Sequence, residues 1–231
     1  SSAASDVYKR QGQFMNITVL GATGMAGAAI AQEATRRGHH VTAVSRNPQE
    51  TNDPHTTVTR LDLTDLEAPL QPVLNDADAV VLAVRMAPGD ESRVAPLTSR
   101  VLDHAAVAGV RVLVVGGAAP LRSPHDRELL VLDDPAFVPT QWRDVASASL
   151  DQFNACTEHP NQNWIYLSPS AVFEPGQGTG AYRRSGDTLL INHDGTSRIT
   201  PADLALAVLD ELEQPSAVHH FTAIELAKGL A

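Results

Sequence analysis

The chain has 231 residues, of which 43% are hydrophobic, and it carries a formal net charge of −10. This length suits one α/β domain, and the acidic balance without a Lys- or Arg-rich run argues against nucleic acid or an anionic membrane as a partner. No apolar run is long enough to cross a membrane, and the lone Cys156 cannot form an internal disulfide, so we expect an inert buried thiol in a cytoplasmic protein.

The strand predicted over residues 16–20 runs directly into three glycines with the spacing G-x-x-G-x-x-G. Gly21 allows a tight turn, Gly24 lets the backbone approach a pyrophosphate, and Gly27 lets the following helix pack closely on the strand. The N-terminus of that helix offers unpaired N–H groups and a partial positive charge to phosphates. Because strand, glycines and helix occur in this order, the segment predicts a dinucleotide-binding site.

The next two elements begin to specify the cofactor. A helix is predicted over Met25–Arg37 and a strand over His40–Val44. In NAD-selective sites an acidic residue near the end of this strand binds the ribose 2′-hydroxyl, whereas an arginine accommodates a 2′-phosphate. Here Ser45 and Arg46 stand at that point, and neither Asp nor Glu lies between the strand and Gln49. The sequence therefore favours NADPH as cofactor and leaves NADH open.

The remaining elements alternate between strands and helices. Strands are predicted over Thr57–Leu61, Ala77–Val84, Val110–Val115, Trp164–Leu167 and Ala217–Thr222, and helices over Leu66–Leu74, Ser92–Ala108, Gln141–Thr157 and Pro201–Glu213. This alternation predicts a Rossmann-like, doubly wound α/β fold with a mainly parallel sheet and helices on both faces. We expect one NAD(P)-binding domain over residues 15–231. Residues 1–14 lack the apolar centre of a signal peptide and are expected to be a disordered arm or a cloning remnant.

Ligands of such a sheet bind outside the carboxyl ends of its strands. The residues predicted to bind the cofactor at this edge are Gly21, Thr23, Gly24, Met25, Ser45, Arg46, Asp62, Leu63, Ala83, Val84, Arg85, Gly116, Gly117, Pro169 and Ser170. No metal is predicted there or elsewhere. The histidine pairs 39–40 and 219–220 would point to opposite faces of a strand, and the other histidines are isolated, so surface or capping roles are expected for them.

A catalytic pair that short-chain dehydrogenases and sugar epimerases commonly use does not occur in this chain. These enzymes use Tyr-x-x-x-Lys, in which the lysine lowers the pKa of the tyrosine so that it can exchange a proton with the substrate. The chain has two lysines, Lys9 and Lys228, and the residues four positions before them are Ser5 and Ile224. The sequence therefore argues against alcohol oxidation by that mechanism and against sugar epimerisation.

Hydride transfer to a flavin or quinone needs no such acid, because the charge spreads over the ring until solvent supplies a proton. We therefore expect a small aromatic acceptor such as FMN or another flavin. Ser123 and Tyr182 are the candidate catalytic hydroxyls, but neither is expected to act as an essential acid. Tyr166 lies in a predicted strand and is expected to belong to the core.

The acceptor is expected to lie under residues 171–197, a Gly-rich and charged segment without periodicity that we predict to be a substrate lid. Phe173 and Tyr182 offer flat rings for stacking on an isoalloxazine, and Arg183 offers a cation for the phosphate of FMN. Met86 completes the predicted acceptor-binding residues.

Several segments of the chain carry a family resemblance. They are GATGMAG at 21–27, RRGHHVTAVSRNP at 36–48, VLVVGGAA at 112–119, NWIYLSPSAVFEPG at 163–176, GTGAYRRSGDTLL at 178–190 and DGTSRITPADLALAVLDELEQP at 194–215. In these segments the chain resembles the bacterial proteins named as NADH-flavin reductases. Those proteins are atypical short-chain dehydrogenase/reductase relatives of flavin reductase/biliverdin reductase B and of NmrA-like proteins. The resemblance covers nearly everything from Met15 onward.

The resemblance implies an NAD(P)H-binding oxidoreductase that reduces free flavin or quinones. Two departures flank the expected nicotinamide pocket: Pro120 stands where a serine is expected, and Arg85 and Met86 replace smaller residues. The identity of the acceptor therefore stays open. Two other functions stay open as well, a non-catalytic NADP sensor of the NmrA-like kind and a tailoring ketoreductase of an aromatic polyketide.

Overall fold

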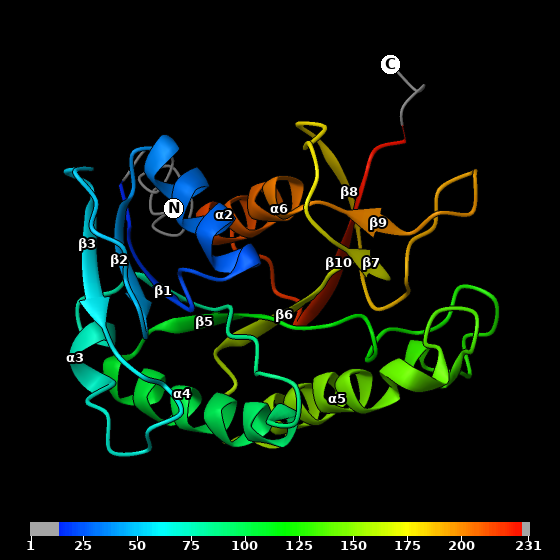
Figure 1. Ribbon diagram of the computed structural model, residues 1–231, viewed down its shortest axis with the longest axis horizontal. Helices are drawn as coiled ribbons and strands as arrows, with labels where there is room; N and C mark the ends of the chain where they lie inside the picture. The colour runs from blue at the N-terminus through cyan, green and yellow to red at the C-terminus, as the bar shows by residue number, and fades with distance from the viewer. Residues whose placement is uncertain (1–13, 228–231) are drawn as a thin grey trace, which may run out of the picture.

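The structure is a computed structural model that describes residues 14–227, so the arm predicted over residues 1–14 lies outside it except for Phe14. An eight-stranded sheet with the order β3-β2-β1-β4-β5-β6-β10-β8 forms its centre (Figure 1). The strands of this sheet are β1 (Asn16–Leu20), β2 (His40–Ser45), β3 (Thr56–Arg60), β4 (Ala79–Leu82), β5 (Arg111–Val115), β6 (Trp164–Ser168), β8 (Tyr182–Ser185) and β10 (His220–Glu225). Its first six positions have the 3-2-1-4-5-6 order of the Rossmann fold, which confirms the predicted fold class.

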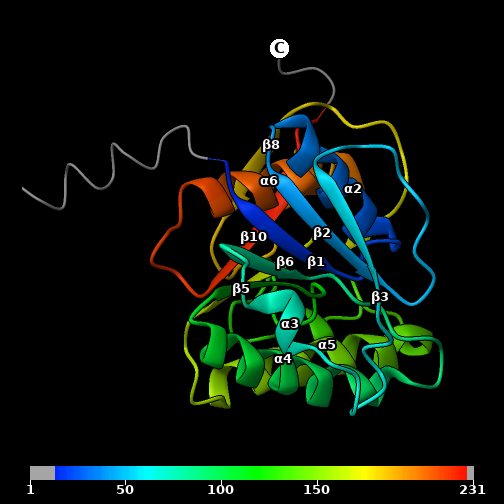
Figure 2. The same cartoon turned by 90° about the vertical axis from the view of Figure 1, so that its left-hand side faces the viewer.

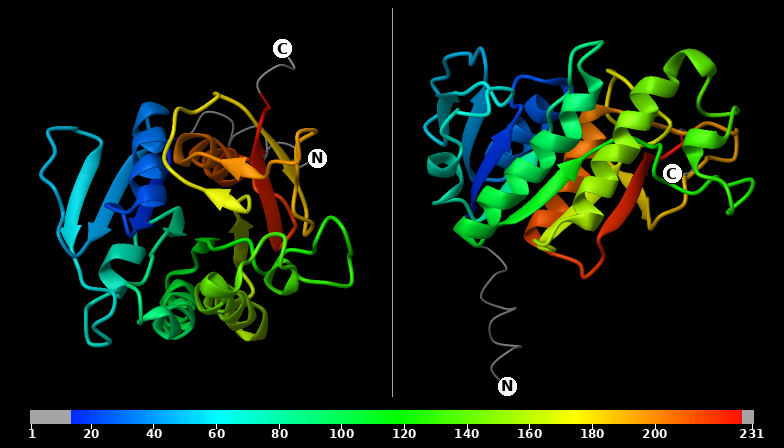
Figure 3. Two further views of the ribbon diagram at one scale, coloured as in Figure 1. Left: turned by 45° about the vertical axis from the view of Figure 1, so that its right-hand side comes forward. Right: turned by 90° about the horizontal axis from the view of Figure 1, so that it is seen from below.

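Helices cover both faces of the sheet. On one face lie α2 (Met25–Arg36) and α6 (Pro201–Glu213), and on the other lie α3 (Gln71–Leu74), α4 (Val94–Ala108) and α5 (Arg143–Glu158) (Figures 1 and 2). Viewed from below, α4 and α5 run side by side across the strands (Figure 3, right). Both faces of the central strands are therefore buried.

Alternate residues of the parallel strands fill two separate hydrophobic clusters. In β1, Val19 packs on the side of α2 and α6, whereas Leu20 packs on the side of α4. In β4, Val81 and Val80 divide in the same way. This alternation explains why the central strands are apolar at nearly every position, as a parallel sheet requires.

Two predicted elements differ from the structure in length or position. The helix predicted over 66–74 is shortened to α3, because Pro69 disfavours helical backbone at Ala68 and an Asp65-based turn occupies the preceding residues. The last strand was predicted over 217–222 and lies at His220–Glu225 instead.

The segment predicted to be irregular contains strands. β7 (Val172–Phe173) pairs with β9 (Arg198–Ile199) in a small parallel ladder, and β8 pairs with β10 in antiparallel fashion at the edge of the main sheet. The loop before β8 is tied down as well: the buried carboxylate of Asp203 accepts hydrogen bonds from the N–H groups of Thr179 and Gly180 at 2.9–3.0 Å. Residues 171–197 are thus an integral part of the fold.

Cys156 lies on α5 and is fully buried, and burial raises the pKa of its thiol to about 12. This confirms the prediction of an inert buried thiol. Among residues 14–227, no helix is long and apolar enough to cross a membrane.

Candidate dinucleotide-binding site

The glycine turn between β1 and α2 has the geometry that the sequence predicts. Gly21 has a φ of +89°, in the left-handed region that favours glycine, and a Cβ there would lie 2.5 Å from the carbonyl oxygen of Ala83. A Cβ on Gly27 would lie 2.0 Å from the Gly21 oxygen, so this glycine lets α2 start directly against the turn. The N–H groups of Gly21 and Ala22 donate to the Val44 carbonyl at 2.9 and 3.0 Å, which fixes the turn to β2.

Gly24 differs from the other two glycines because its own surroundings leave room for a methyl group. Its φ is −73°, and an added Cβ would meet only the oxygens of Gly21 at 3.4 Å and Ala83 at 3.8 Å. Gly24 is the N-cap of α2, and the N–H groups of the first helical turn have no acceptor within a helix. Packing within the protein does not require a glycine at this position. A glycine at a helix N-terminus does, however, allow a phosphate to approach the backbone closely. A nucleotide pyrophosphate therefore fits this turn.

A cleft of about 220 Å³ opens at the carboxyl ends of β1 to β4. Its lining includes these predicted residues: Gly21, Thr23, Gly24, Ser45, Arg46, Asp62, Leu63, Ala83, Val84, Arg85 and Met86. The sequence analysis missed further lining residues, which are Leu61, Thr64, Ala87, Asp90 and Arg93. Asp90 lies between a predicted buried strand and the next predicted helix, and Arg93 stands at the start of that helix, so their place at this edge of the sheet was the available signal.

The wall of the cleft beside β2 and β3 carries charges of both signs. The carboxylate of Asp62 accepts hydrogen bonds from the hydroxyl of Thr64 at 2.7 Å and from its N–H at 2.9 Å. These bonds, and next the positive charges of Arg46 and Arg93, hold the pKa of Asp62 below its usual range. Asp62 is therefore ionised at neutral pH and suits a hydrogen-bond acceptor rather than a proton donor.

Gly116 and Gly117 follow β5, one strand away from β4, and large side chains fill the space around them. A Cβ on Gly116 would lie 1.8 Å from the hydroxyl oxygen of Tyr166, and a Cβ on Gly117 would lie 2.3 Å from the Ser149 hydroxyl. The Gly117 N–H donates to the Tyr166 hydroxyl, which in turn donates to the Ser149 carbonyl. Tyr166 and Ser149 thus pack directly against the backbone at this point, and Tyr166 belongs to the core as predicted.

The two candidate catalytic hydroxyls do not line the cleft. Ser123 is fully buried and donates to the Asp134 carboxylate at 2.6 Å, which is the main reason that the pKa of Asp134 is lowered. The Tyr182 hydroxyl donates to Asp210 of α6 at 2.6 Å, and burial together with this contact raises the pKa of Tyr182. Both O–H groups are therefore engaged inside the protein.

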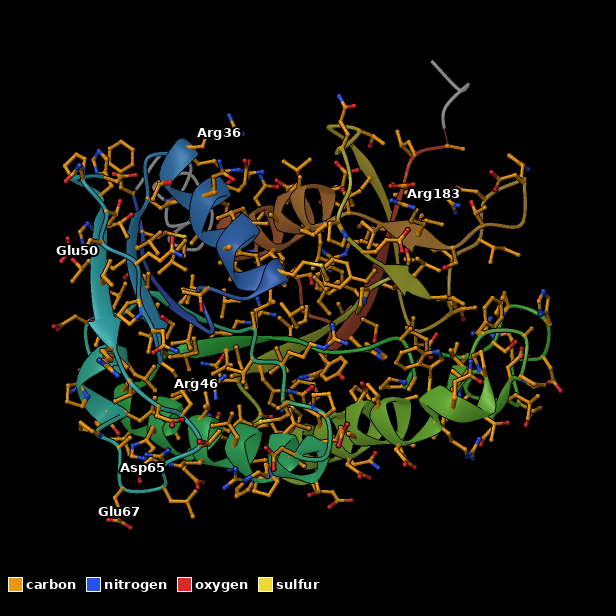
Figure 4. The ribbon with its side chains drawn as sticks, viewed as in Figure 1. Arg36, Arg46, Glu50, Asp65, Glu67 and Arg183 are labelled. Atoms are coloured by element: carbon orange, nitrogen blue, oxygen red, sulfur yellow. The ribbon has the colours of Figure 1, made fainter. Side chains whose placement is uncertain are left out.

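The structure also separates the predicted acceptor-binding residues from the cleft, with the exception of Met86. Phe173 packs against the hydrophobic cluster below α2 and α6, and the Arg183 guanidinium donates to the Ile191 carbonyl at 3.2 Å. Arg183 and Arg46 lie toward opposite ends of the molecule (Figure 4). The sequence hypothesis treated residues 182–185 as part of an irregular lid, whereas they form the edge strand β8.

Five predicted cofactor contacts lie outside the cleft lining: Gly116 and Gly117, discussed above, and Met25, Pro169 and Ser170. Met25 begins α2. The Ser170 hydroxyl is buried and donates to the Ala223 carbonyl at 2.8 Å. Its side chain therefore holds the chain after β6 to β10.

His39 is buried and His220 is partly buried, contrary to the surface or capping roles expected for the histidines. His39 is 4% exposed and contacts Glu213 at 2.7 Å. His220 contacts the Ser168 hydroxyl at 2.8 Å, and burial lowers the pKa of His220 to about 4. Within residues 14–227, no group of His, Cys, Asp and Glu side chains is arranged to hold a metal ion.

The fold and the cleft together define a dinucleotide-binding protein of the Rossmann type. Residues 21–215 match the NAD(P)H-binding family, and the chain belongs to that family. It is 36% identical over 203 residues to the uncharacterised protein YwnB of Bacillus subtilis (strain 168), which covers 87% of this chain and 93% of YwnB.

Solved structures extend this similarity. A protein of Streptococcus pneumoniae TIGR4 that is provisionally named an NADH-flavin reductase is 30% identical, with a TM-score of 0.82 over 92% of this chain and 100% of that one. A protein of Bacteroides thetaiotaomicron that is provisionally named an epimerase is 31% identical, with a TM-score of 0.82 over 93% of this chain and 99% of that one. ChuY, an anaerobillin reductase of Escherichia coli O157:H7, shares the fold at 17% identity and a TM-score of 0.64. The resemblance inferred from the motifs is confirmed.

Proposed function

We propose that the protein is an NAD(P)H-dependent reductase that delivers hydride to a small conjugated ring such as a flavin or a quinone. The observation that carries this proposal is that the hydroxyl groups considered as proton donors are all hydrogen-bonded within the protein. Ser123, Tyr166 and Tyr182 each donate to an acceptor within the protein. A reaction whose product takes its proton from solvent suits a site of this kind.

Binding of the cofactor is assigned to the two ends of the cleft. The glycine turn and the N-terminus of α2 would hold the pyrophosphate through backbone N–H groups. Arg46 would meet a 2′-phosphate, because within residues 14–227 its side chain makes no hydrogen bond or ion pair with the protein, and it projects on the side of the sheet where α4 lies (Figure 4). NADPH is therefore the preferred cofactor in this proposal.

Positioning of the rings is assigned to the glycines after β5. When bound, a reduced nicotinamide supplies the hydride. Gly116 and Gly117 present a backbone without side chains, and Tyr166 and Ser149 keep that backbone from moving away from the sheet. A backbone fixed in this way would help to hold two rings at the short separation that hydride transfer needs. The name of the Streptococcus pneumoniae relative agrees with a flavin as acceptor.

The test is the steady-state consumption of NADPH and NADH with FMN, riboflavin and menadione as separate acceptors. We expect acceptor-dependent oxidation of NADPH. Tight binding of NADPH without turnover of any ring acceptor would favour the sensor function instead. Turnover confined to the ketone of a polyketide-like substrate would favour the ketoreductase.

We predict that Tyr182→Phe lowers turnover less than tenfold, because its hydroxyl is engaged by Asp210 rather than by the cleft. Loss of an essential general acid costs about 10²–10⁴-fold. Ser123→Ala is expected to behave in the same way once its lower thermal stability is taken into account. The measurement is kcat with the best acceptor at saturating NADPH, and a drop above about a thousandfold for either variant would contradict acid-free transfer.

A further inference from the structure

A second arginine enters the cleft from the wall opposite Arg46. Arg93 ends the short helical turn η1 (Glu91–Arg93) between β4 and α4, whereas Arg46 follows β2. Both side chains line the same cleft, although they come from elements on opposite sides of β1 in the sheet. Asp62 and Asp90 line the cleft as well, so its lining holds three arginines and two carboxylates, a small positive excess in a chain with a net charge of −10.

Arg93 is available to a ligand. Its side chain is 56% exposed, and its acidic partner is Asp90, with an N–O separation of 3.9 Å at the limit of an ion pair. Such a contact between exposed side chains contributes little. Arg93, Arg46 and Asp62 line the same cleft, and the positive charges of both arginines help to lower the pKa of the Asp62 carboxyl.

The remaining arginine of the cleft belongs to its other end. Arg85 follows Ala83 and Val84, whose backbone atoms would lie 2.5–3.2 Å from a Cβ on Gly21. Arg85 thus extends from the chain beside the pyrophosphate turn. Arg46 and Arg93 instead come from the end of β2 and from the β4–α4 connection.

We infer that Arg93 is a specificity-determining residue that, together with Arg46, holds the 2′-phosphate of NADPH from opposite walls of the cleft. A phosphomonoester carries about two negative charges near neutral pH and has three acceptor oxygens, which suits two guanidinium donors better than one. NADH lacks this group and gains nothing from Arg93. This inference depends on the part of the proposed function that names NAD(P)H as cofactor. It does not depend on which acceptor takes the hydride.

The test compares dissociation constants rather than turnover. NADPH and NADH are titrated separately, by nicotinamide fluorescence, into the unmodified protein, Arg46→Ala, Arg93→Ala and the double variant. Arg93→Ala is expected to raise the Kd of NADPH roughly tenfold, the effect of losing one charge-assisted hydrogen bond, and to leave the Kd of NADH within about twofold. Arg127→Ala is the matched control, because Arg127 is 75% exposed and contacts Asp187 only at 3.8 Å.

Equal losses of NADH and NADPH affinity in Arg93→Ala, or no loss of either, would overturn the assignment. A protein that binds neither dinucleotide would overturn it together with the proposed function. A protein that prefers NADPH but reduces no acceptor would end the reductase proposal alone, since the Kd comparison still decides the role of Arg93.

Discussion

Gly21→Ala is expected to weaken NADPH binding by more than about a hundredfold. The φ of +89° at this position costs a residue with a Cβ about 1–2 kcal/mol, and the Cβ would also lie 2.5 Å from the Ala83 oxygen, which belongs to backbone and cannot rotate away. The turn would have to move off β4, and the hydrogen bonds from Gly21 and Ala22 to Val44 would break with it. The measurement is the Kd of NADPH by fluorescence titration.

Gly195→Ala is the control that separates the effect of backbone strain from the effect of the steric clash at position 21. Gly195 has a similar φ of +82°, but a Cβ there would meet no atom within 4 Å. This control is expected to lose some thermal stability and to bind NADPH as the parent does. If Gly21→Ala bound NADPH with the parent's affinity, the assignment of the turn to the pyrophosphate would be wrong.

Glu211→Gln is expected to lower the free energy of unfolding by about 3 kcal/mol, because it removes a buried charge that two arginines share. Glu211 is fully buried on α6 and accepts hydrogen bonds from Arg111 of β5 at 3.0 Å and Arg184 of β8 at 2.6 Å. The N–H of Ser216 donates to it as well, at 2.9 Å. The expected drop in Tm is about 6–12 °C for a chain of this size, measured by calorimetry.

The contribution of Glu211 to the free energy of unfolding should decrease as the pH becomes acidic. Burial alone would raise the pKa of Glu211, but the guanidinium of Arg184 and the N–H of Ser216 outweigh it and leave the pKa below its ordinary value of 4.5. A carboxyl with a lowered pKa stabilises the fold above its unfolded pKa and loses that contribution as the pH falls through its folded pKa. The difference between parent and variant should therefore be constant near neutrality and shrink below about pH 4.5.

Glu174→Gln serves as the control for this comparison. Glu174 contacts Arg198 near the surface, with its own side chain 51% exposed, so the change is expected to cost less than about 1 kcal/mol. Equal effects of the two substitutions would mean that the buried cluster does not join α6 to β5 and β8 as described.

Local features of the sequence determined the first half of the fold and the cofactor turn. The run from the strand at 16–20 through Gly21 to Gly27 specifies its structure within a dozen residues, because strand, left-handed turn and helix start each depend on near neighbours. Arg46 could be assigned to the same edge because parallel strands end on one side of a sheet. The cleft confirms that placement of Arg46 beside the turn.

Only the tertiary structure decided which strands residues 170–225 form and which side chains line the cleft. β8 is Gly-flanked and charged, with no periodicity of its own, and it forms because β10 presents an edge with which it can pair. The Tyr182 hydroxyl donates a hydrogen bond to Asp210, and the Ser123 hydroxyl donates one to Asp134. Both acceptors lie elsewhere in the sequence, so neither bond could be read from a local pattern. Arg93 and Arg46 line the same cleft because of how the β4–α4 connection folds, a placement that no local pattern encodes.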